Sequence, residues 1–184
     1  MSIYHDIIIL CWAVFLVVWG ISALQAKRTI GSFWRGIFIR LALAAVVAFI
    51  LSQNIFQSIQ IRNYFNPTLG MIGDVLGVLG IGFAIWARVN LGRNWGMPRS
   101  IKENPELVTT GPYAYVRHPI YTGLILALLG TALVVGPAWL IICAAVTTHF
   151  IYSAIAEERI MLREFPESYP EYMQRSKMLI PFIF

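Results

Sequence analysis

The chain has few charged residues for its length. Only 12% of its 184 residues are Asp, Glu, Lys or Arg, while 58% are hydrophobic. Soluble domains carry about 25% charged residues, and a single soluble core of this length cannot bury so much apolar surface. The composition therefore excludes an ordinary soluble globular domain and predicts that lipid covers much of the chain.

Cysteines and the common cofactor and metal motifs are also scarce. The two cysteines, Cys11 and Cys143, both lie inside apolar runs, where packed thiols are the usual outcome. The sequence contains no zinc-ligand spacing, no phosphate-binding loop and no G-x-G-x-x-G. We therefore expect neither a disulfide nor a metal site.

Basic residues outnumber acidic ones and give a net charge of +5. They are spread over short segments between apolar runs, a pattern typical of cytoplasmic loops and not of a surface that binds nucleic acid. The first apolar run has neither a basic segment before it nor a small-residue cleavage site, so we expect a retained membrane span. No nucleic-acid partner is expected.

Five segments are apolar over the length that a bilayer requires, about 20 residues in a helix. The third is rich in glycine, and its Gly73 and Gly77 form a G-x-x-x-G that allows close helix contact. Only Gly136 and Pro137 separate the last two, which predicts a tight antiparallel helical hairpin. The predicted fold class is all-α, an integral membrane bundle of five transmembrane helices. The segments are approximately 7–24, 37–56, 69–91, 119–135 and 138–156.

The positive charges predict the orientation of this bundle. With five spans, every Lys and Arg except Arg62 falls on one side of the membrane. Cytoplasmic loops carry the excess of Lys and Arg, so we expect the N-terminus outside and the C-terminus in the cytoplasm. The expected location is the inner membrane of a bacterium or the endoplasmic reticulum of a eukaryote. We expect one membrane domain over 1–184, with two scaffold spans in 1–68 and the functional core in 69–184.

Two groups of chemically active residues flank the predicted hairpin. Residues 107–123 contain a Gly-Pro turn, three tyrosines, an arginine and His118, and alone they also fit an aromatic and basic belt at the membrane interface. Glu157 and Glu158 end the last span, where they can also simply extend into water. Because the hairpin places one helix start beside the other helix end, His118 and Tyr121 are expected near the two glutamates. Such a site would suit a zwitterionic, cationic or ribose-bearing ligand.

These residues resemble the isoprenylcysteine carboxyl methyltransferase family, and more loosely the membrane phospholipid methyltransferases. The resemblance runs from about residue 91 to the C-terminus. It rests on L-V-T-T-G-P-Y-x-Y-x-R-H-P-x-Y-x-G at 107–123, then E-E at 157–158 and F-P-E-S-Y-P-E-Y at 165–172. It implies a multi-span enzyme, with a methyltransferase core in 69–184, that uses S-adenosylmethionine to methylate a lipophilic acceptor in contact with membrane lipids. An isoprenylcysteine-type carboxylate is one such acceptor.

The resemblance implies site residues at the positions of this chain that match those of the family. Glu157 is expected to hold a polar group of the cofactor, and Arg117 and Glu158 are candidates for a catalytic role. Ser153 and Arg159 are candidates for acceptor contacts. Ser153 stands where eukaryotic members have a substrate-binding arginine, so a prenylcysteine carboxylate would lack that partner here. The predicted cofactor contacts are Lys102, Pro105, Glu106, Leu107, Val108, Tyr113, His118, Pro119, Ile120, Tyr121 and Glu157.

Other functions fit the same residues. A phospholipid N-methyltransferase or a small-thiol methyltransferase would differ only in the acceptor. A reductase related to the sterol reductases, which share a similar terminal helical arrangement and use NADPH, is an alternative of another class. A non-catalytic membrane subunit or small-molecule binder is a further alternative, although the gathering of titratable motifs on one side argues against it. A general base is optional if the acceptor is already a carboxylate or a thiolate.

Overall fold

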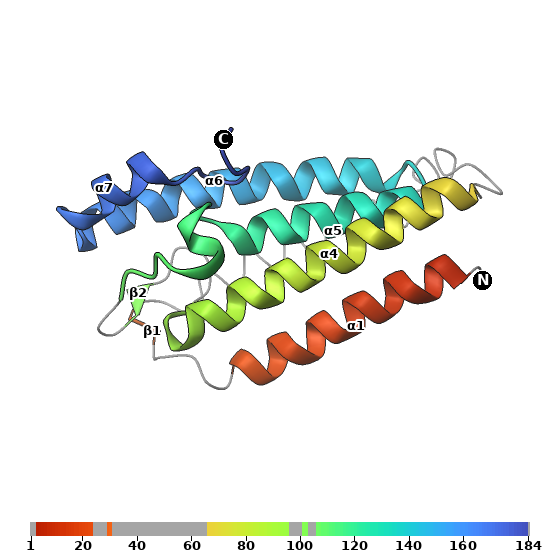
Figure 1. The fold of residues 1–184 in the computed structure, drawn as a ribbon, viewed down its shortest axis with the longest axis horizontal. Coiled ribbons are helices and arrows are strands. Elements are labelled where there is room, and N and C mark those ends of the chain that lie inside the picture. The colour runs from red at the N-terminus through yellow and green to blue at the C-terminus, as the bar shows by residue number, and fades with distance from the viewer. Residues whose placement is uncertain (1–2, 24–28, 31–65, 96–100, 103–105, 184) are drawn as a thin grey trace.

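The computed structural model describes residues 3–23, 29–30, 66–95, 101–102 and 106–183. Its main feature is a set of long helices that lie side by side (Figure 1). The α-helices are α1 (Ile3–Ala23), α4 (Pro67–Leu91), α5 (Pro119–Val135), α6 (Trp139–Glu164) and α7 (Ser168–Arg175). The 3-10 helices are η1 (Gly92–Asn94) and η2 (Gly111–Ala114), and the strands are β1 (Thr29–Ile30) and β2 (Ile101–Lys102).

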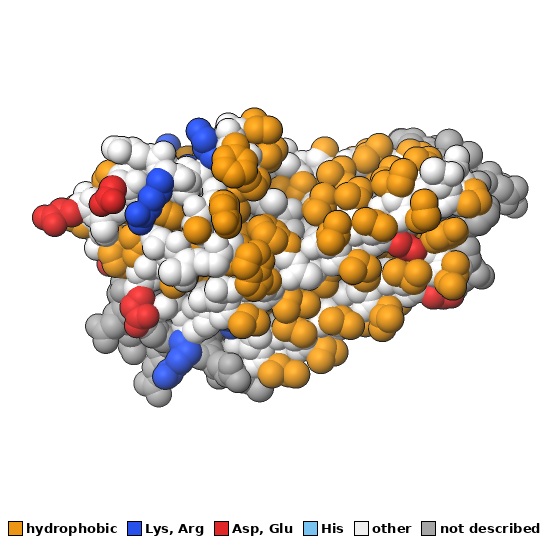
Figure 2. Space-filling model, viewed as in Figure 1, with side chains coloured by type: hydrophobic (Ala, Val, Ile, Leu, Met, Phe, Trp, Pro, Cys, Tyr) orange, Lys and Arg blue, Asp and Glu red, His pale blue; other side chains and the backbone are white. Residues whose placement is uncertain are grey.

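Three of the described helices, α1, α4 and α6, are long and apolar enough to cross a membrane, and α5 is a shorter apolar helix. These four helices correspond to four of the five predicted spans, while the segment 37–56 lies outside the described residues. Hydrophobic side chains cover the middle and right of the visible surface, and Lys and Arg gather towards the left end, where α7 lies (Figure 2). The described helices and this surface are those of an integral membrane protein.

The predicted terminal hairpin is confirmed. α5 ends at Val135 and α6 begins at Trp139, so residues 136–138 alone connect them. Gly136 has a φ of 140°, a backbone conformation that favours glycine, and its N–H bonds to the carbonyl of Ala132. Pro119 opens α5 in the first turn, where its missing N–H leaves no hydrogen bond unmade.

α6 is longer than the sequence predicted, because it continues past residue 156 to Glu164. The added residues include Glu, Arg, Met and Leu, which are favourable helix formers, and polarity does not end a helix that has left the hydrocarbon. Glu157 and Glu158 therefore lie about two turns before the helix end. Their negative charges are therefore not at the helix C-terminus, where the helix dipole would disfavour them.

α4 and α5 approach closely through glycines. A Cβ atom on Gly80 would lie 2.6 Å from both the carbonyl oxygen of Gly123 and the backbone nitrogen of Ala127. A Cβ atom on Gly73 would lie 2.7 Å from the carbonyl oxygen of Gly130. Small residues allow two membrane helices to pack backbone against backbone. The close helix contact predicted from the glycine-rich third segment is present.

The ends of α1 and α4 meet at the end of the bundle that carries the candidate site. Arg88 of α4 donates to the carbonyl oxygen of Ser22 in α1 at 2.5 Å and to that of Gly92 at 2.7 Å. The segments that follow the two helices pair as β1 and β2, with Thr29 opposite Lys102. This two-residue pairing adds a small antiparallel contact that the all-α prediction did not include, because it depends on where the helix ends meet.

Candidate functional site

The backbone after α7 lies beside the start of α5. The N–H of Arg117 donates to the carbonyl of Lys177 at 2.8 Å, and the N–H of His118 donates to the carbonyl of Met178 at 3.1 Å. One turn further along, the hydroxyl of Thr122 donates to the carbonyl of Leu179 at 2.6 Å. These bonds fix the backbone of the R-H-P motif against a segment about 60 residues later in the chain.

Arg117 and Glu158, the two candidates for a catalytic role, form an ion pair. Nε of Arg117 lies 2.6 Å from Oε1 of Glu158, and both side chains are only 9% exposed. Nη1 of Arg117 also donates to the carbonyl oxygen of Ser176 at 2.6 Å. The guanidinium therefore links α5, α6 and the segment after α7, which is a structural role whether or not either residue takes part in chemistry.

His118 lies between the two glutamates of α6. Its Nδ1 is 3.6 Å from Oε2 of Glu157, and its Nε2 is 3.4 Å from Oε1 of Glu158. The hydroxyl of Tyr121 donates to Oε1 of Glu157 at 2.6 Å. The expected proximity of His118 and Tyr121 to the two glutamates is confirmed.

Three rings form a stack beside these polar groups. The ring centroids of His118 and Tyr121 are 5.5 Å apart with an interplanar angle of 5°. Those of Tyr121 and Phe150 are 4.5 Å apart at 8°. Tyr121 is buried together with Ala154 and Leu179, and the half-buried Ile120 packs against them. The site thus has a polar side towards the end of the bundle and an apolar, aromatic side towards its middle.

Tyr113 and Tyr172 connect η2 to α7. The hydroxyl of Tyr172 donates to the carbonyl oxygen of Tyr113 at 2.6 Å in a buried contact. Burial raises the pKa of Tyr172 to about 12 and raises that of Tyr113 as well. Since the Tyr172 phenol loses its proton only when the pH rises through that value, it remains a hydrogen-bond donor throughout the physiological range.

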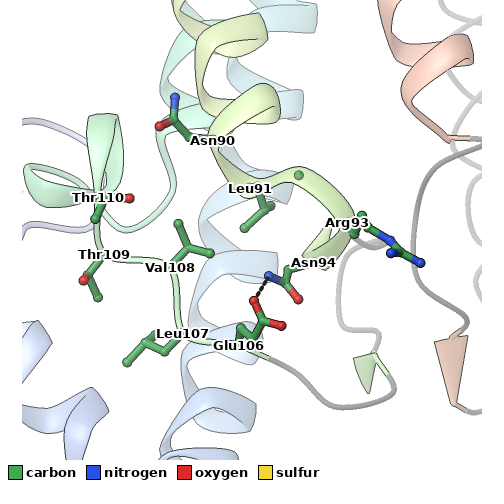
Figure 3. Close-up of a pocket in the computed structure, with 10 residues that line it drawn as sticks. Asn90, Leu91, Arg93, Asn94, Glu106, Leu107, Val108, Thr109 and Thr110 are labelled. Atoms are coloured by element: carbon green, nitrogen blue, oxygen red, sulfur yellow. Dashed lines mark hydrogen bonds between the residues drawn. The ribbon is translucent and has the colours of Figure 1, made fainter.

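A pocket of about 530 Å³ opens between the end of α4 and the segment before η2 (Figure 3). Nδ2 of Asn94 donates to Oε2 of Glu106 at 3.2 Å, and the two side chains point towards each other, whereas Arg93 points away. The volume lies within the range of about 300–1,000 Å³ that is usual for small-molecule sites. The pocket is lined by Asn90, Leu91, Gly92, Arg93, Asn94, Glu106, Leu107, Val108, Thr109 and Thr110.

The predicted cofactor contacts thus fall into two groups at the same end of the bundle. Glu106, Leu107 and Val108 line the pocket, whereas His118, Tyr121 and Glu157 form the cluster. η2, with the buried Tyr113, connects the two groups along the chain, and Pro119 and Ile120 begin α5 beside the cluster. Pro105 and the side chain of Lys102 lie outside the described residues.

The two candidates for acceptor contacts lie in different surroundings. Ser153 is fully buried, and its hydroxyl has no hydrogen-bond partner among the residues that the structure describes. Arg159 is exposed and lies two positions after Glu157, which is a rotation of about 200° around the helix. Arg159 therefore projects away from the cluster, and the structure does not bring it together with Ser153.

Asn90 and Asn94 were not among the site residues predicted from the sequence. Both line the pocket, and Asn94 bonds to Glu106. Asn90 lies in the last turn of α4 and Asn94 ends η1, and the signal that the sequence contained is two amides where an apolar span ends. The tail motif at 165–172 was recognised, but the bond from its last tyrosine, Tyr172, to η2 had no local signature.

Residues 69–168 match the phospholipid methyltransferase family. The matched stretch is just over half of the chain and contains α5 and α6 complete and α4 without its first two residues. The chain belongs to the phospholipid methyltransferase family. This membership agrees with the motifs at 107–123 and 157–172, which resemble those of membrane methyltransferases.

Relatives cover different parts of the chain. The cobalt-zinc-cadmium resistance protein CzcN of Cupriavidus metallidurans is 31% identical over 74% of this chain and 60% of its own length. Methanethiol S-methyltransferase 1 of Bradyrhizobium diazoefficiens is 42% identical over 42% of this chain and 27% of its own length. Protein-S-isoprenylcysteine O-methyltransferase of Schizosaccharomyces pombe is 33% identical over 53% of this chain and 43% of its own length. The matches thus cover between about a quarter and three fifths of these relatives.

Proposed function

We propose that the chain is an S-adenosylmethionine-dependent methyltransferase that acts on a lipophilic acceptor at the cytoplasmic membrane surface. The observation that carries this proposal is the cluster of His118, Tyr121 and Glu157, which joins two motifs that are far apart in the sequence. The cluster lies within the stretch that matches the phospholipid methyltransferase family. In this proposal residues 69–184 are the methyltransferase core and residues 1–68 are a scaffold.

The site offers groups that fit S-adenosylmethionine, which contains a sulfonium cation, an amino-acid zwitterion, a ribose and an adenine. The carboxylate of Glu157 can accept hydrogen bonds from hydroxyl or amino groups. The imidazole of His118 lies within 3.6 Å of both glutamates and adds a polar ring to this side of the site. The pocket beside Glu106 has a volume suited to a small molecule.

The chain's own residues would position the reactants and exclude water. When bound, the cofactor supplies a methyl group activated by the positive sulfonium. The hydroxyl of Tyr121 holds the carboxylate of Glu157 in place. Ile120, Phe150 and Leu179 pack around Tyr121 and keep water from the membrane side of the cluster. Placing a nucleophile in line with a methyl group can account for most of the acceleration without an acid or base.

The charges of the cluster favour a thiol acceptor over a carboxylate. Arg117 already bonds to Glu158 and to the carbonyl of Ser176, so its guanidinium is not available to bind the carboxylate of an acceptor. Ser153 supplies a neutral hydroxyl, and Glu157 would repel a carboxylate, which is charged at neutral pH, more than a neutral thiol that loses its proton to water as the methyl group is transferred. A relative with 42% identity over its matched stretch is named a methanethiol S-methyltransferase. An isoprenylcysteine-type carboxylate and a phospholipid amine are the alternative acceptors.

Transfer of a radiolabelled methyl group tests the activity and the acceptor together. The purified protein in lipid nanodiscs is incubated with labelled S-adenosylmethionine and either a lipid extract, a series of alkanethiols or a prenylcysteine. We expect label in a thioether, which is stable to base, whereas a methyl ester would release labelled methanol. Absence of transfer to every acceptor would contradict the proposed activity and favour a non-catalytic binder.

The reductase alternative is tested on the same preparation. A protein related to the sterol reductases would bind NADPH, whose reduced nicotinamide absorbs in the near ultraviolet. We expect no nicotinamide to be retained on purification and no NADPH consumption with lipid extract. Retained nicotinamide cofactor would contradict the methyltransferase proposal directly.

A further inference from the structure

A short segment after the candidate site carries large hydrophobic side chains on its outside. Ile180 is 49% exposed, Phe182 is 84% exposed and Ile183 is 76% exposed. They follow Leu179, which is buried against Tyr121. Neighbouring large apolar side chains that remain exposed usually mark a surface that contacts a membrane or a partner.

The hydrogen bonds to α5 place this segment beside the apolar part of the bundle. The carbonyls of Lys177, Met178 and Leu179 accept bonds in order from Arg117, His118 and Thr122. The pairing of residue 177 with residue 116 is parallel, so the segment runs in the same direction as α5. Leu179 lies level with the first turn of an apolar helix, and Figure 1 shows the chain turned back from α7 to lie over α6.

The backbone conformation of Phe182 also suits a residue whose side chain contacts something outside the protein. Its φ of 67° lies in the left-handed region, which glycine and asparagine adopt most readily. The N–H of Ile183 bonds to the carbonyl of Ile180 and closes the turn. A bulky aromatic residue is not required by such a turn, and at 84% exposure its side chain gains little from packing within the described structure.

Basic residues precede the apolar segment. Arg175 and Lys177 are exposed, and Arg175 pairs weakly with Glu171 at 3.8 Å. Cations beside exposed apolar residues are typical of segments that enter the headgroup region, because the cations meet anionic lipid while the apolar side chains reach the acyl chains. Figure 2 shows Lys and Arg side chains next to the hydrophobic surface at this end of the molecule.

We propose that residues Ile180–Ile183 insert into the bilayer at the surface where the candidate site lies, with Phe182 and Ile183 in contact with lipid acyl chains. The insertion holds the preceding residues 177–179 against the start of α5. The candidate site is thereby assembled fully only in a membrane. This inference concerns a lipid contact and stands whether or not the chain transfers methyl groups.

Depth measurement by spin labelling tests the insertion. A nitroxide is attached to Phe182→Cys in a chain that also carries Cys11→Ala and Cys143→Ala, reconstituted in nanodiscs of phosphatidylcholine and phosphatidylglycerol. Val78→Cys, on the exposed apolar side of α4, and Glu167→Cys, exposed before α7, are the matched controls. We expect the Phe182 label to resemble the Val78 label, with high access to oxygen and low access to a polar nickel chelate. Access to the chelate like that at Glu167, or protection from both reagents, would overturn the inference.

Proteolysis tests the effect of insertion on the site. Phe182→Glu with Ile183→Glu makes the segment unfavourable in hydrocarbon, and Lys177 is a trypsin site in the segment that pairs with α5. We expect cleavage after Lys177 in nanodiscs to become about tenfold faster or more, because two large side chains lose their burial. Glu167→Gln should leave the rate unchanged. An unchanged rate in the double variant would show that lipid does not hold the segment.

Discussion

Glu157 is the residue on which the proposed cofactor site depends most. It accepts a hydrogen bond from Tyr121 and lies near His118, and a carboxylate has about four acceptor positions in all. Glu158, its neighbour along the chain, is paired with Arg117. The two adjacent glutamates therefore differ in what they can do, since one is paired with a guanidinium and the other faces a neutral phenol and an imidazole.

Replacing Glu157 by Gln should weaken the binding of S-adenosylhomocysteine by about tenfold to a hundredfold, because a charged hydrogen bond contributes about 1.5–3 kcal/mol. Isothermal titration calorimetry in lipid nanodiscs measures the change. Glu167→Gln, which alters an exposed glutamate, should leave the affinity unchanged. Equal affinities for the wild type and Glu157→Gln would remove this residue from the site.

The buried pair of Arg117 and Glu158 gives a prediction for stability. Arg117→Met leaves the carboxylate of Glu158 without its guanidinium and should destabilise the fold by about 3–5 kcal/mol. Because two apolar side chains can replace a buried pair, adding Glu158→Leu should recover much of this loss. Unfolding in detergent, followed by circular dichroism, distinguishes these cases. A single variant as stable as the wild type would mean that the pair is not buried in the protein.

At the scale of elements, the contact of α4 with α5 leaves the least room for side chains. Gly80 faces the backbone of α5 without room for a side chain, whereas nothing lies within 4 Å of a Cβ atom built on Gly82. The two glycines lie on the same helix and differ only in the side that they face. Backbone contacts of this kind hold α5, and with it the start of the R-H-P motif, at a fixed distance from α4.

Gly80→Ala should therefore lower stability, by about 1–3 kcal/mol, since a methyl group must displace backbone atoms of α5. Gly82→Ala is the matched control and should be neutral or slightly stabilising, because alanine favours the helix. The melting temperatures of the two variants in the same detergent give the comparison. Similar melting temperatures for both would contradict the close contact of α4 with α5.

At the scale of the whole molecule, the arrangement of charges predicts how the protein lies in the membrane. Thr68→Cys, at the start of α4, should react with an impermeant maleimide from outside intact cells. Glu167→Cys should react only after the membrane is made permeable, because Lys and Arg collect on the cytoplasmic side. Both variants carry Cys11→Ala and Cys143→Ala. The reverse labelling pattern would invert the orientation and move the candidate site to the outer surface.

The sequence determined the terminal hairpin well because its evidence was local. Gly136 and Pro137 between two apolar runs predicted the link between α5 and α6, and the hairpin in turn predicted that Tyr121 approaches Glu157. The partner of each glutamate could not be predicted, because a choice between neighbours depends on side-chain direction within one turn of α6.

Contacts between distant segments were likewise beyond the sequence. Residues 177–179 are held on α5 mainly by backbone hydrogen bonds. Residues of almost any type can make such bonds, so they leave no motif in the sequence. The bond between Asn94 and Glu106 depends on how the end of α4 meets the loop before η2. Such pairs are set by tertiary packing, which a local pattern of residue types does not encode.

We have proposed that the cluster of His118, Tyr121 and Glu157 is a cofactor site for methyl transfer. Titration of the purified wild-type protein in nanodiscs with S-adenosylhomocysteine tests it most directly, because binding requires neither the acceptor nor turnover. We expect saturable binding with one site per chain, which Glu157→Gln weakens. A folded preparation that releases no heat and shows no competition with labelled S-adenosylmethionine at millimolar ligand would contradict it.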